Sequence, residues 1–115
     1  MTKRSPITTH ILDTSRGRPA AGVPVRLERG GDDGWTELAL GATDDDGRVG
    51  DLLPPGPIEP GTYRISFDTD AYYAEMGGEC FYPVVSIAFT IRASDEHYHV
   101  PLLLNPFGFS TYRGS

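Results

Sequence analysis

The chain has 115 residues, of which 38% are hydrophobic and 23% charged, as in one small globular domain. Its formal net charge of -6 argues against binding to nucleic acid or to an anionic membrane surface. No apolar run has the length of a secretory signal or a membrane span, which favours a cytoplasmic location. We therefore expect a single domain over residues 1–115, with residues 1–6 as a polar lead-in.

Turn residues divide the chain into about eight short predicted strands. In chain order these are PITTHILD (6–13), VPVRLERG (23–30), WTELALGAT (35–43), RVGDLL (48–53), GTYRISFDT (61–69), VVSIAFTIRA (84–93), HYHVPLLL (97–104) and FGFSTYRG (107–114). Several of them alternate apolar and polar residues, which is typical of strands with one buried face. The pattern predicts an all-β sandwich.

Two segments depart from this strand pattern. The segment PPGPIEPG at 54–61 is expected to be irregular, because proline is excluded from central strands and from helix interiors. The segment TDAYYAEMGG at 69–78 predicts one short helix, capped by Thr69 or Asp70 and ended by Gly77 or Gly78.

The single cysteine of the chain, Cys80, cannot form an internal disulfide. No base lies near it in the sequence that would activate a thiolate. We expect a free, buried thiol in a reducing compartment, and the role of Cys80 is left open.

Histidines stand on predicted strands rather than in loops. The side-chain period of two places His97 and His99 on one face of strand 97–104. The opposite, apolar face of that strand consists of Tyr98, Val100, Leu102 and Leu104. On the first strand, Thr8, His10 and Leu12 share a face.

This arrangement allows three interpretations. The histidines could be surface or partner-contacting residues without chemistry. They could bind a metal, because His-x-His places two imidazoles on one side of a strand and His10 could supply a third. They could instead form a metal-free hydrolytic site, in which a histidine accepts a proton from water and an arginine stabilises a developing negative charge.

Several segments resemble the transthyretin family. The first strand pair, ITTHILDTSRGRPAAGVPVRLE, is similar to the family's opening, and GTYRISFDTDAYY and FYPVVSIAFTI to its middle. The segment HYHVPLLLNPFGFSTYRGS resembles the last two strands. The ending YRGS is similar to that of the family's enzymes, which hydrolyse 5-hydroxyisourate in purine breakdown, whereas the hormone carriers end differently.

The resemblance implies specific site residues. The catalytic positions of the family's enzymes match His10 in THILD, Arg48 in DDDGRVGDL, His99 in HYHVPLLL and Ser115 at the end of the sequence. Tyr112, Arg113 and Gly114 are expected to contact the substrate. His97 is not among the transferred positions and is interpreted as structural. Asn105, Phe107 and Phe109 are mild departures, because the family often has Ser or Tyr there.

The same resemblance implies an eight-stranded sandwich with one short helix, assembled as a homotetramer with active sites between dimers. No metal or other cofactor is expected. One of His10 and His99 would activate water, with the choice between them open, while Arg48 would hold a substrate oxygen. Ser115 would offer its hydroxyl and the chain's carboxylate. The alternative function is a transthyretin-like protein that binds a small ligand without catalysis.

Overall fold

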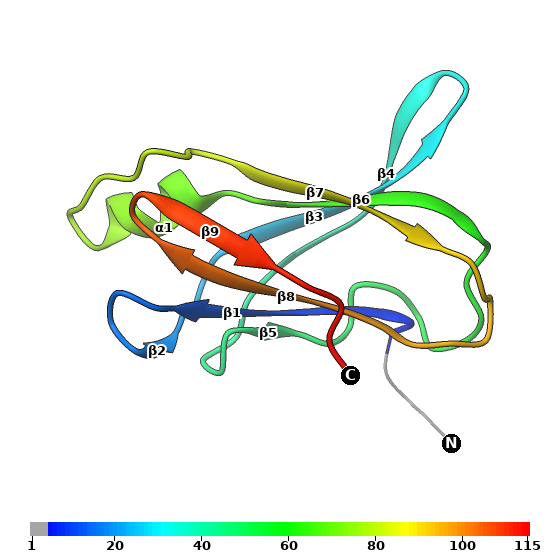
Figure 1. The fold of residues 1–115 in the computed structure, drawn as a ribbon, viewed down its shortest axis with the longest axis horizontal. Helices are drawn as coiled ribbons and strands as arrows, with labels where there is room; N and C mark the ends of the chain where they lie inside the picture. Colours follow the sequence, from blue (N-terminus) through cyan, green and yellow to red (C-terminus); the bar gives the residue numbers. More distant parts are fainter. Residues whose placement is uncertain (1–4) are drawn as a thin grey trace.

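The computed structural model describes residues 5–115, which form a sandwich of two β-sheets with one short helix at one end (Figure 1). In chain order the elements are β1 (Ile7–Asp13), β2 (Arg18–Pro19), β3 (Pro24–Gly31), β4 (Gly34–Ala42), β5 (Arg48–Val49), β6 (Gly61–Phe67), α1 (Thr69–Glu75), β7 (Val85–Ile91), β8 (Tyr98–Asn105) and β9 (Gly108–Thr111). The predicted all-β class with a short helix is therefore confirmed. Of these strands, β2 and β5 have only two residues each.

The first sheet has the order β2-β1-β8-β9, with β5 also paired to β1. Strand β1 runs parallel to β8, with Thr8 opposite His99, and antiparallel to β5. The second sheet has the order β4-β3-β6-β7 and is antiparallel throughout. The β3–β4 hairpin extends beyond the sandwich (Figure 1).

The core lies between the sheets and follows the predicted alternation. On β3, Val25 and Leu27 are buried, and on β6 Tyr63, Ile65 and Phe67 are buried. The predicted inner face of β8 is buried along its whole length: Tyr98, Val100, Leu102 and Leu104. The opposite faces of β1 and β8 are consequently turned outward, and they carry the histidines.

The short helix begins one residue earlier than predicted. Its N-cap is Asp68, whose carboxylate accepts a hydrogen bond from the Ala71 backbone N–H at 3.0 Å. Thr69 cannot cap it, because its buried hydroxyl donates to the Tyr82 carbonyl. The predicted end is confirmed at Gly77, whose φ of 74° is the left-handed conformation that glycine adopts most readily.

The N-terminal lead-in expected over residues 1–6 is partly fixed to the body. Its first four residues lie outside the described part of the chain. Ser5 is buried, and its hydroxyl accepts the Leu53 N–H at 3.1 Å and donates to the Ile7 carbonyl at 2.6 Å. Ser5 thus connects the start of β1 to the loop after β5.

Cys80 is half-buried against the edge of the core, and burial raises the pKa of its thiol. A raised pKa lowers the thiolate fraction at neutral pH and with it the nucleophilicity of the residue.

Within residues 5–115, no helix is long and apolar enough to cross a membrane.

Candidate active site

Arg48 is brought opposite His10 by a tight acidic turn. The Asp44 carboxylate accepts the backbone N–H groups of Asp46 and Arg48, each at 2.9 Å. Gly47 adopts a φ of 74°, and its carbonyl accepts the Ile11 N–H at 2.8 Å. The turn therefore fixes the register of β5 on β1, in which His10 and Arg48 are direct partners.

This position keeps His10 largely uncharged. Burial lowers the pKa of the His10 imidazole below its ordinary value, and the positive charge of Arg48 lowers it further. Two effects raise the His10 pKa: a hydrogen bond with the Asp46 backbone, and the negative charges of Asp44 and Asp46. They do not reverse the overall lowering. A neutral imidazole at neutral pH can accept a proton or a hydrogen bond.

At the opposite edge of β1, where it pairs with β8, one hydroxyl joins two histidines. The Oγ1 of Thr8 lies 2.8 Å from Nδ1 of His99 and 2.9 Å from Nε2 of His97. Thr8 is 7% exposed, so little water competes for these bonds. The two imidazole rings are nearly parallel, with centroids 6.5 Å apart and an interplanar angle of 17°.

The C-terminal segment packs directly on His99. The Gly114 N–H donates to the His99 carbonyl at 2.8 Å. A Cβ at position 114 would lie 2.6 Å from Cδ2 of His99 and 3.1 Å from Cγ of Pro101. Only glycine fits here without moving the imidazole, which gives the Gly of the YRGS ending a steric role.

These elements surround a pocket of about 240 Å³. Its lining consists of Thr8, Thr9, Arg48, Val49, Gly50, His99 and Ser115. The structure thus brings together three of the predicted catalytic residues, Arg48, His99 and Ser115. The fourth, His10, lies beside the pocket on the same face of β1 as Thr8.

Tyr112 and Arg113 lie on the other side of His99. Both border a neighbouring pocket of about 230 Å³ that His99 also borders. The guanidinium of Arg113 lies 4.4 Å from the centre of the Tyr98 ring and 2.9 Å from a Glu96 carboxylate oxygen. Arg113 therefore binds its own chain, and its predicted contact with substrate stays a prediction.

Two residues, Thr8 in the pocket lining and His97 bonded to it, were not predicted as functional. Thr8 was noted only as sharing a face with His10, and His97 was interpreted as structural. The alternation along each strand predicted the face on which Thr8 and His97 lie. It did not predict the parallel pairing of β1 and β8, which brings the two residues together. Among residues 5–115, no three side chains of the metal-binding types come together as a cluster.

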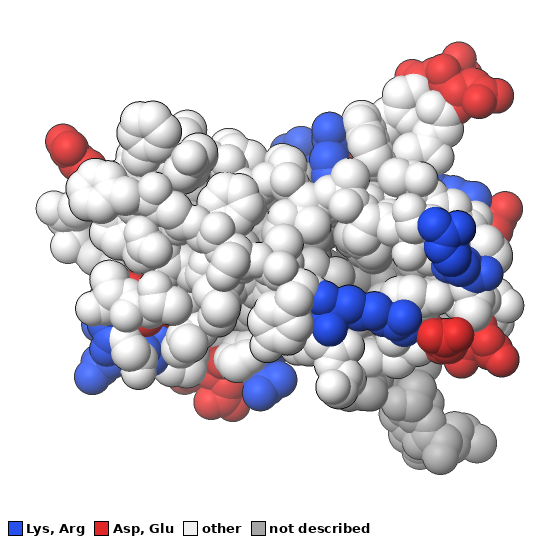
Figure 2. All heavy atoms as spheres, viewed as in Figure 1, with Lys and Arg blue, Asp and Glu red and all other residues white. Residues whose placement is uncertain are grey.

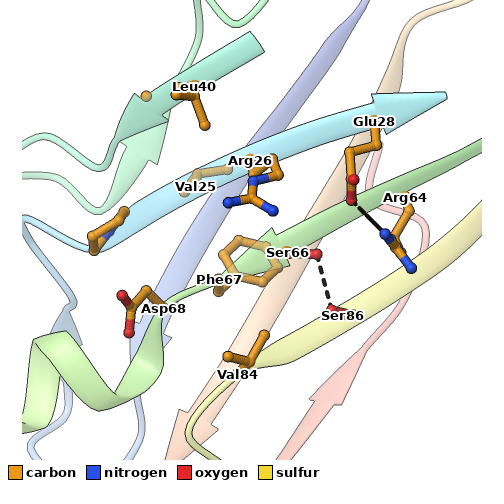
Figure 3. A pocket seen from close by; sticks show the side chains of 12 residues that line it. Val25, Arg26, Glu28, Leu40, Arg64, Ser66, Phe67, Asp68, Val84 and Ser86 are labelled. Carbon is orange, nitrogen blue, oxygen red and sulfur yellow. Dashed lines mark hydrogen bonds and ion pairs between the residues drawn. The ribbon is translucent and has the colours of Figure 1, made fainter. Parts of the chain in front are cut away.

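A larger hollow of about 450 Å³ lies on the outer face of the second sheet (Figure 3). In it the Glu28 carboxylate pairs with Arg64 at 2.8 Å, and the hydroxyls of Ser66 and Ser86 lie 2.9 Å apart. These four polar side chains thus pair with one another. None of the predicted site residues lines it, whereas three of them line the pocket on the first sheet, which we take as the candidate active site.

Comparison with known proteins identifies the family of this chain. Residues 7–114 match the model of the HIUase/Transthyretin family. The chain belongs to this family. It is 49% identical to 5-hydroxyisourate hydrolase of Mus musculus, over 99% of this chain and 98% of the mouse protein.

Two solved structures show how similar the family's folds are. The 5-hydroxyisourate hydrolase of Klebsiella pneumoniae superposes with a TM-score of 0.83 at 39% identity, over 95% of this chain and 92% of that one. Sea bream transthyretin in complex with thyroxine gives a TM-score of 0.89 at 34% identity, over 96% and 95% of the two chains. The backbone therefore establishes the transthyretin-like sandwich but does not separate an enzyme from a carrier, and the site residues must do so.

Proposed function

We propose that this protein hydrolyses 5-hydroxyisourate to 2-oxo-4-hydroxy-4-carboxy-5-ureidoimidazoline, a step in the degradation of urate. The observation that carries the proposal is the pocket that joins Arg48, His99 and Ser115, with His10 directly opposite Arg48. Nearly full-length identity of 49% to the mouse hydrolase supports the choice of substrate.

In the proposed reaction, water attacks the carbonyl carbon of a ring amide. An imidazole of His10 or His99 accepts the proton of the attacking water. Arg48 holds the carbonyl oxygen as it gains negative charge in the tetrahedral intermediate. The C–N bond then breaks, and the departing ring nitrogen receives a proton from the imidazolium. No cofactor enters these steps.

The residues of the C-terminal segment would complete the site. Ser115, which lines the pocket, would orient the substrate or a histidine through its hydroxyl. Gly114 would allow the close packing on His99, and Tyr112 would narrow the entrance for a flat, purine-sized molecule. Arg113 is assigned to substrate binding only as a prediction from the family's motif.

The alternative is a protein that binds a small ligand without catalysis. Its strongest support is the close superposition with sea bream transthyretin, whose structure holds thyroxine. A binding channel has no need for a neutral imidazole beside a guanidinium, and this pair favours the hydrolase.

A direct assay distinguishes the two functions. Urate oxidase generates 5-hydroxyisourate from urate, and its ultraviolet absorbance then decays spontaneously. We expect this protein to accelerate the decay in proportion to its concentration. If the decay keeps its spontaneous rate at every protein concentration, the hydrolase assignment is wrong.

We further propose a homotetramer, a dimer of dimers with the sites at the interface between dimers. In the described part of the chain, β7 and β9 are open sheet edges, which readily pair with another chain. The surface over β9 is mostly uncharged, and acidic side chains gather instead at the tip of the β3–β4 hairpin (Figure 2). Near these edges Phe81, Val84, Phe107 and Tyr112 are all more than half exposed.

Light scattering tests the assembly, and we expect the mass of four chains. A monomer with full activity would contradict a site shared between subunits.

We also propose a cytoplasmic location, which is consistent with the free thiol of Cys80.

A further inference from the structure

We propose that Thr8 and His97 form a proton relay behind His99, so that His99 is the base of the hydrolysis and Thr8 and His97 are positioning residues. The inference rests on the proposed active site and decides which of the two candidate histidines activates water. Its basis is the single Thr8 hydroxyl located between ring nitrogens of His97 and His99.

The hydrogen-bond chemistry of a hydroxyl restricts the protonation of this trio. Thr8 has one O–H donor and accepts through its lone pairs. It can donate to only one of the two imidazoles, so the nitrogen of the other must carry a proton and donate to Thr8. The protonation of His97 and the tautomer of His99 are therefore coupled.

One of the two possible directions of these hydrogen bonds allows His99 to act as a general base. If Nδ1–H of His99 donates to Thr8 and Thr8 donates to Nε2 of His97, then Nε2 of His99 carries the lone pair. His99 lines the pocket together with Arg48 and Ser115, so this direction gives the pocket a histidine with a free ring nitrogen. His10 does not line this pocket, which favours His99 as the base.

Three proton transfers make up the relay. The attacking water gives a proton to Nε2 of His99, and Nδ1 of His99 passes its proton to Oγ1 of Thr8. Thr8 passes its own proton to Nε2 of His97. His99 is then neutral with its proton on Nε2, and His97 holds the positive charge. The reverse transfers return a proton to the departing ring nitrogen of the substrate.

The charge of Arg48 disfavours a positive charge that stays on His99. A cationic His99 would share its pocket with the Arg48 guanidinium, and His10 lies on the same face of β1. His97 lies two residues before His99 in the sequence, and its ring centre is 6.5 Å from that of His99. Beside His97, the Glu96 carboxylate pairs with Arg113 at 2.9 Å, and Arg113 also donates to the His97 carbonyl at 3.4 Å.

Paired variants at Thr8 test the relay. Thr8→Val removes the hydroxyl at nearly constant volume, and we expect kcat to fall at least about tenfold with KM changed less than about twofold. Thr8→Ser keeps a hydroxyl and should retain kcat within about threefold of wild type. Thr14→Val is the matched control, because it removes a threonine hydroxyl bonded to the Leu104 carbonyl at the far end of β1.

His97→Gln provides a second test that does not depend on Thr8. Glutamine can hydrogen-bond to Thr8 but cannot accept its proton, so the relay stops. In mixtures of H₂O and D₂O, we expect a curved dependence of kcat on deuterium fraction for wild type, as for several protons in motion. His97→Gln and Thr8→Val should give straight lines, and the acid limb of their pH–rate profiles should move.

The outcomes separate the relay from the active-site assignment. The relay is refuted if Thr8→Val matches Thr14→Val in kcat, or if His97→Gln keeps the kcat and the curvature of wild type. His99→Ala belongs in the same series. Near-normal activity in His99→Ala would refute the proposed site itself, whereas an inactive His99→Ala beside a normal Thr8→Val would reject the relay alone.

Discussion

His10 and Arg48 face each other as direct partners on the antiparallel strands β1 and β5. They are 38 residues apart in the sequence, and the turn at 44–47 brings them together through the bonds of Asp44 and Gly47. The guanidinium holds the His10 pKa down in addition to the effect of burial. The pair therefore places an imidazole with a lowered pKa beside a charge-stabilising guanidinium on one sheet face.

Arg48→Gln should raise the pKa of His10. The substitution removes the positive charge that disfavours the imidazolium and leaves the effect of Asp44 and Asp46, which favour it. Burial remains the largest cause, so the shift should be a partial recovery toward the ordinary value. The pH titration of the His10 ring proton by NMR measures it. Arg26→Gln, on the opposite sheet, is the control, and an equal shift there would show that Arg48 has no specific effect.

His10→Ala, Arg48→Ala and His99→Ala should each lower the hydrolysis rate at least about a hundredfold, the contribution typical of a positioned acid–base or charge-stabilising group. The side chains lie on an outward sheet face, so the core should be preserved. Rates of 5-hydroxyisourate decay, with circular dichroism as the folding control, check this. Two near-normal variants among the three would contradict the assignment.

Much of the fold follows from alternation in the sequence. Buried and outward faces of β1, β3, β6 and β8 were predicted from a period of two, because a half-buried strand has to alternate. The helix cap was placed one residue late, since Asp68, Thr69 and Asp70 are all residues that cap helices well. Only the packed structure shows that the Thr69 hydroxyl is engaged with Tyr82.

The candidate site was predicted less completely. The assignment to the site came from a family resemblance, not from periodicity, for His10, Arg48, His99 and Ser115. Periodicity gave the faces of β1 and β8 but not their pairing, and the contact of Thr8 with His99 depends on that pairing. Which strands pair is decided by contacts between distant segments, which a single sequence does not reveal.

Tyr72→Phe should destabilise the fold through Asp13. This carboxyl is fully buried; burial acts to raise its pKa, but hydrogen bonds from Ser15, Tyr72 and Arg16 lower it overall. The Tyr72 hydroxyl donates to Asp13 at 2.7 Å, and its loss should cost about 1.5–3 kcal/mol of unfolding free energy. Tyr63→Phe, which loses a bond to the neutral Glu59 carbonyl, should cost about 0.5–1.5 kcal/mol. Urea unfolding at pH 7 measures both.

The difference in unfolding free energy between wild type and Tyr72→Phe should depend on pH in a definite direction. Because folding lowers the Asp13 pKa, its ionised form stabilises the native state above the unfolded pKa, which is near 3.8. This stabilisation disappears as the pH falls through the lower folded value. Wild type should therefore lose more stability than Tyr72→Phe on acidification below about pH 4. A difference between the two proteins that stays constant down to pH 2 would contradict this account.

Gly47→Ala should destabilise the protein more than Gly22→Ala. Both glycines have left-handed φ angles, 74° and 75°, so each alanine should cost about 1–2 kcal/mol from backbone strain. At position 22 no atom lies within 4 Å of the added Cβ, whereas at position 47 the Ile11 carbonyl oxygen lies 2.5 Å away. The clash would separate β5 from β1 and move Arg48 away from His10. Thermal unfolding and the hydrolysis rate measure the two effects, and equal losses in both variants would argue against the close packing at Gly47.

Gly114→Ala should reduce activity while the sandwich stays folded. Its Cβ would lie 2.6 Å from Cδ2 of His99 and 3.1 Å from Pro101, so the His99 ring has to move. A displacement of about 1 Å in a catalytic group can cost roughly a hundredfold in rate, and we expect a loss in kcat of at least about tenfold. Gly108→Ala is the matched control, because its Cβ would make only ordinary contacts with Asn105 at 3.8 and 3.9 Å. The assay is hydrolysis of 5-hydroxyisourate, with the unfolding midpoint in urea as the measure of folding. A Gly114→Ala protein as active as Gly108→Ala would mean that the position of the His99 ring does not limit the reaction.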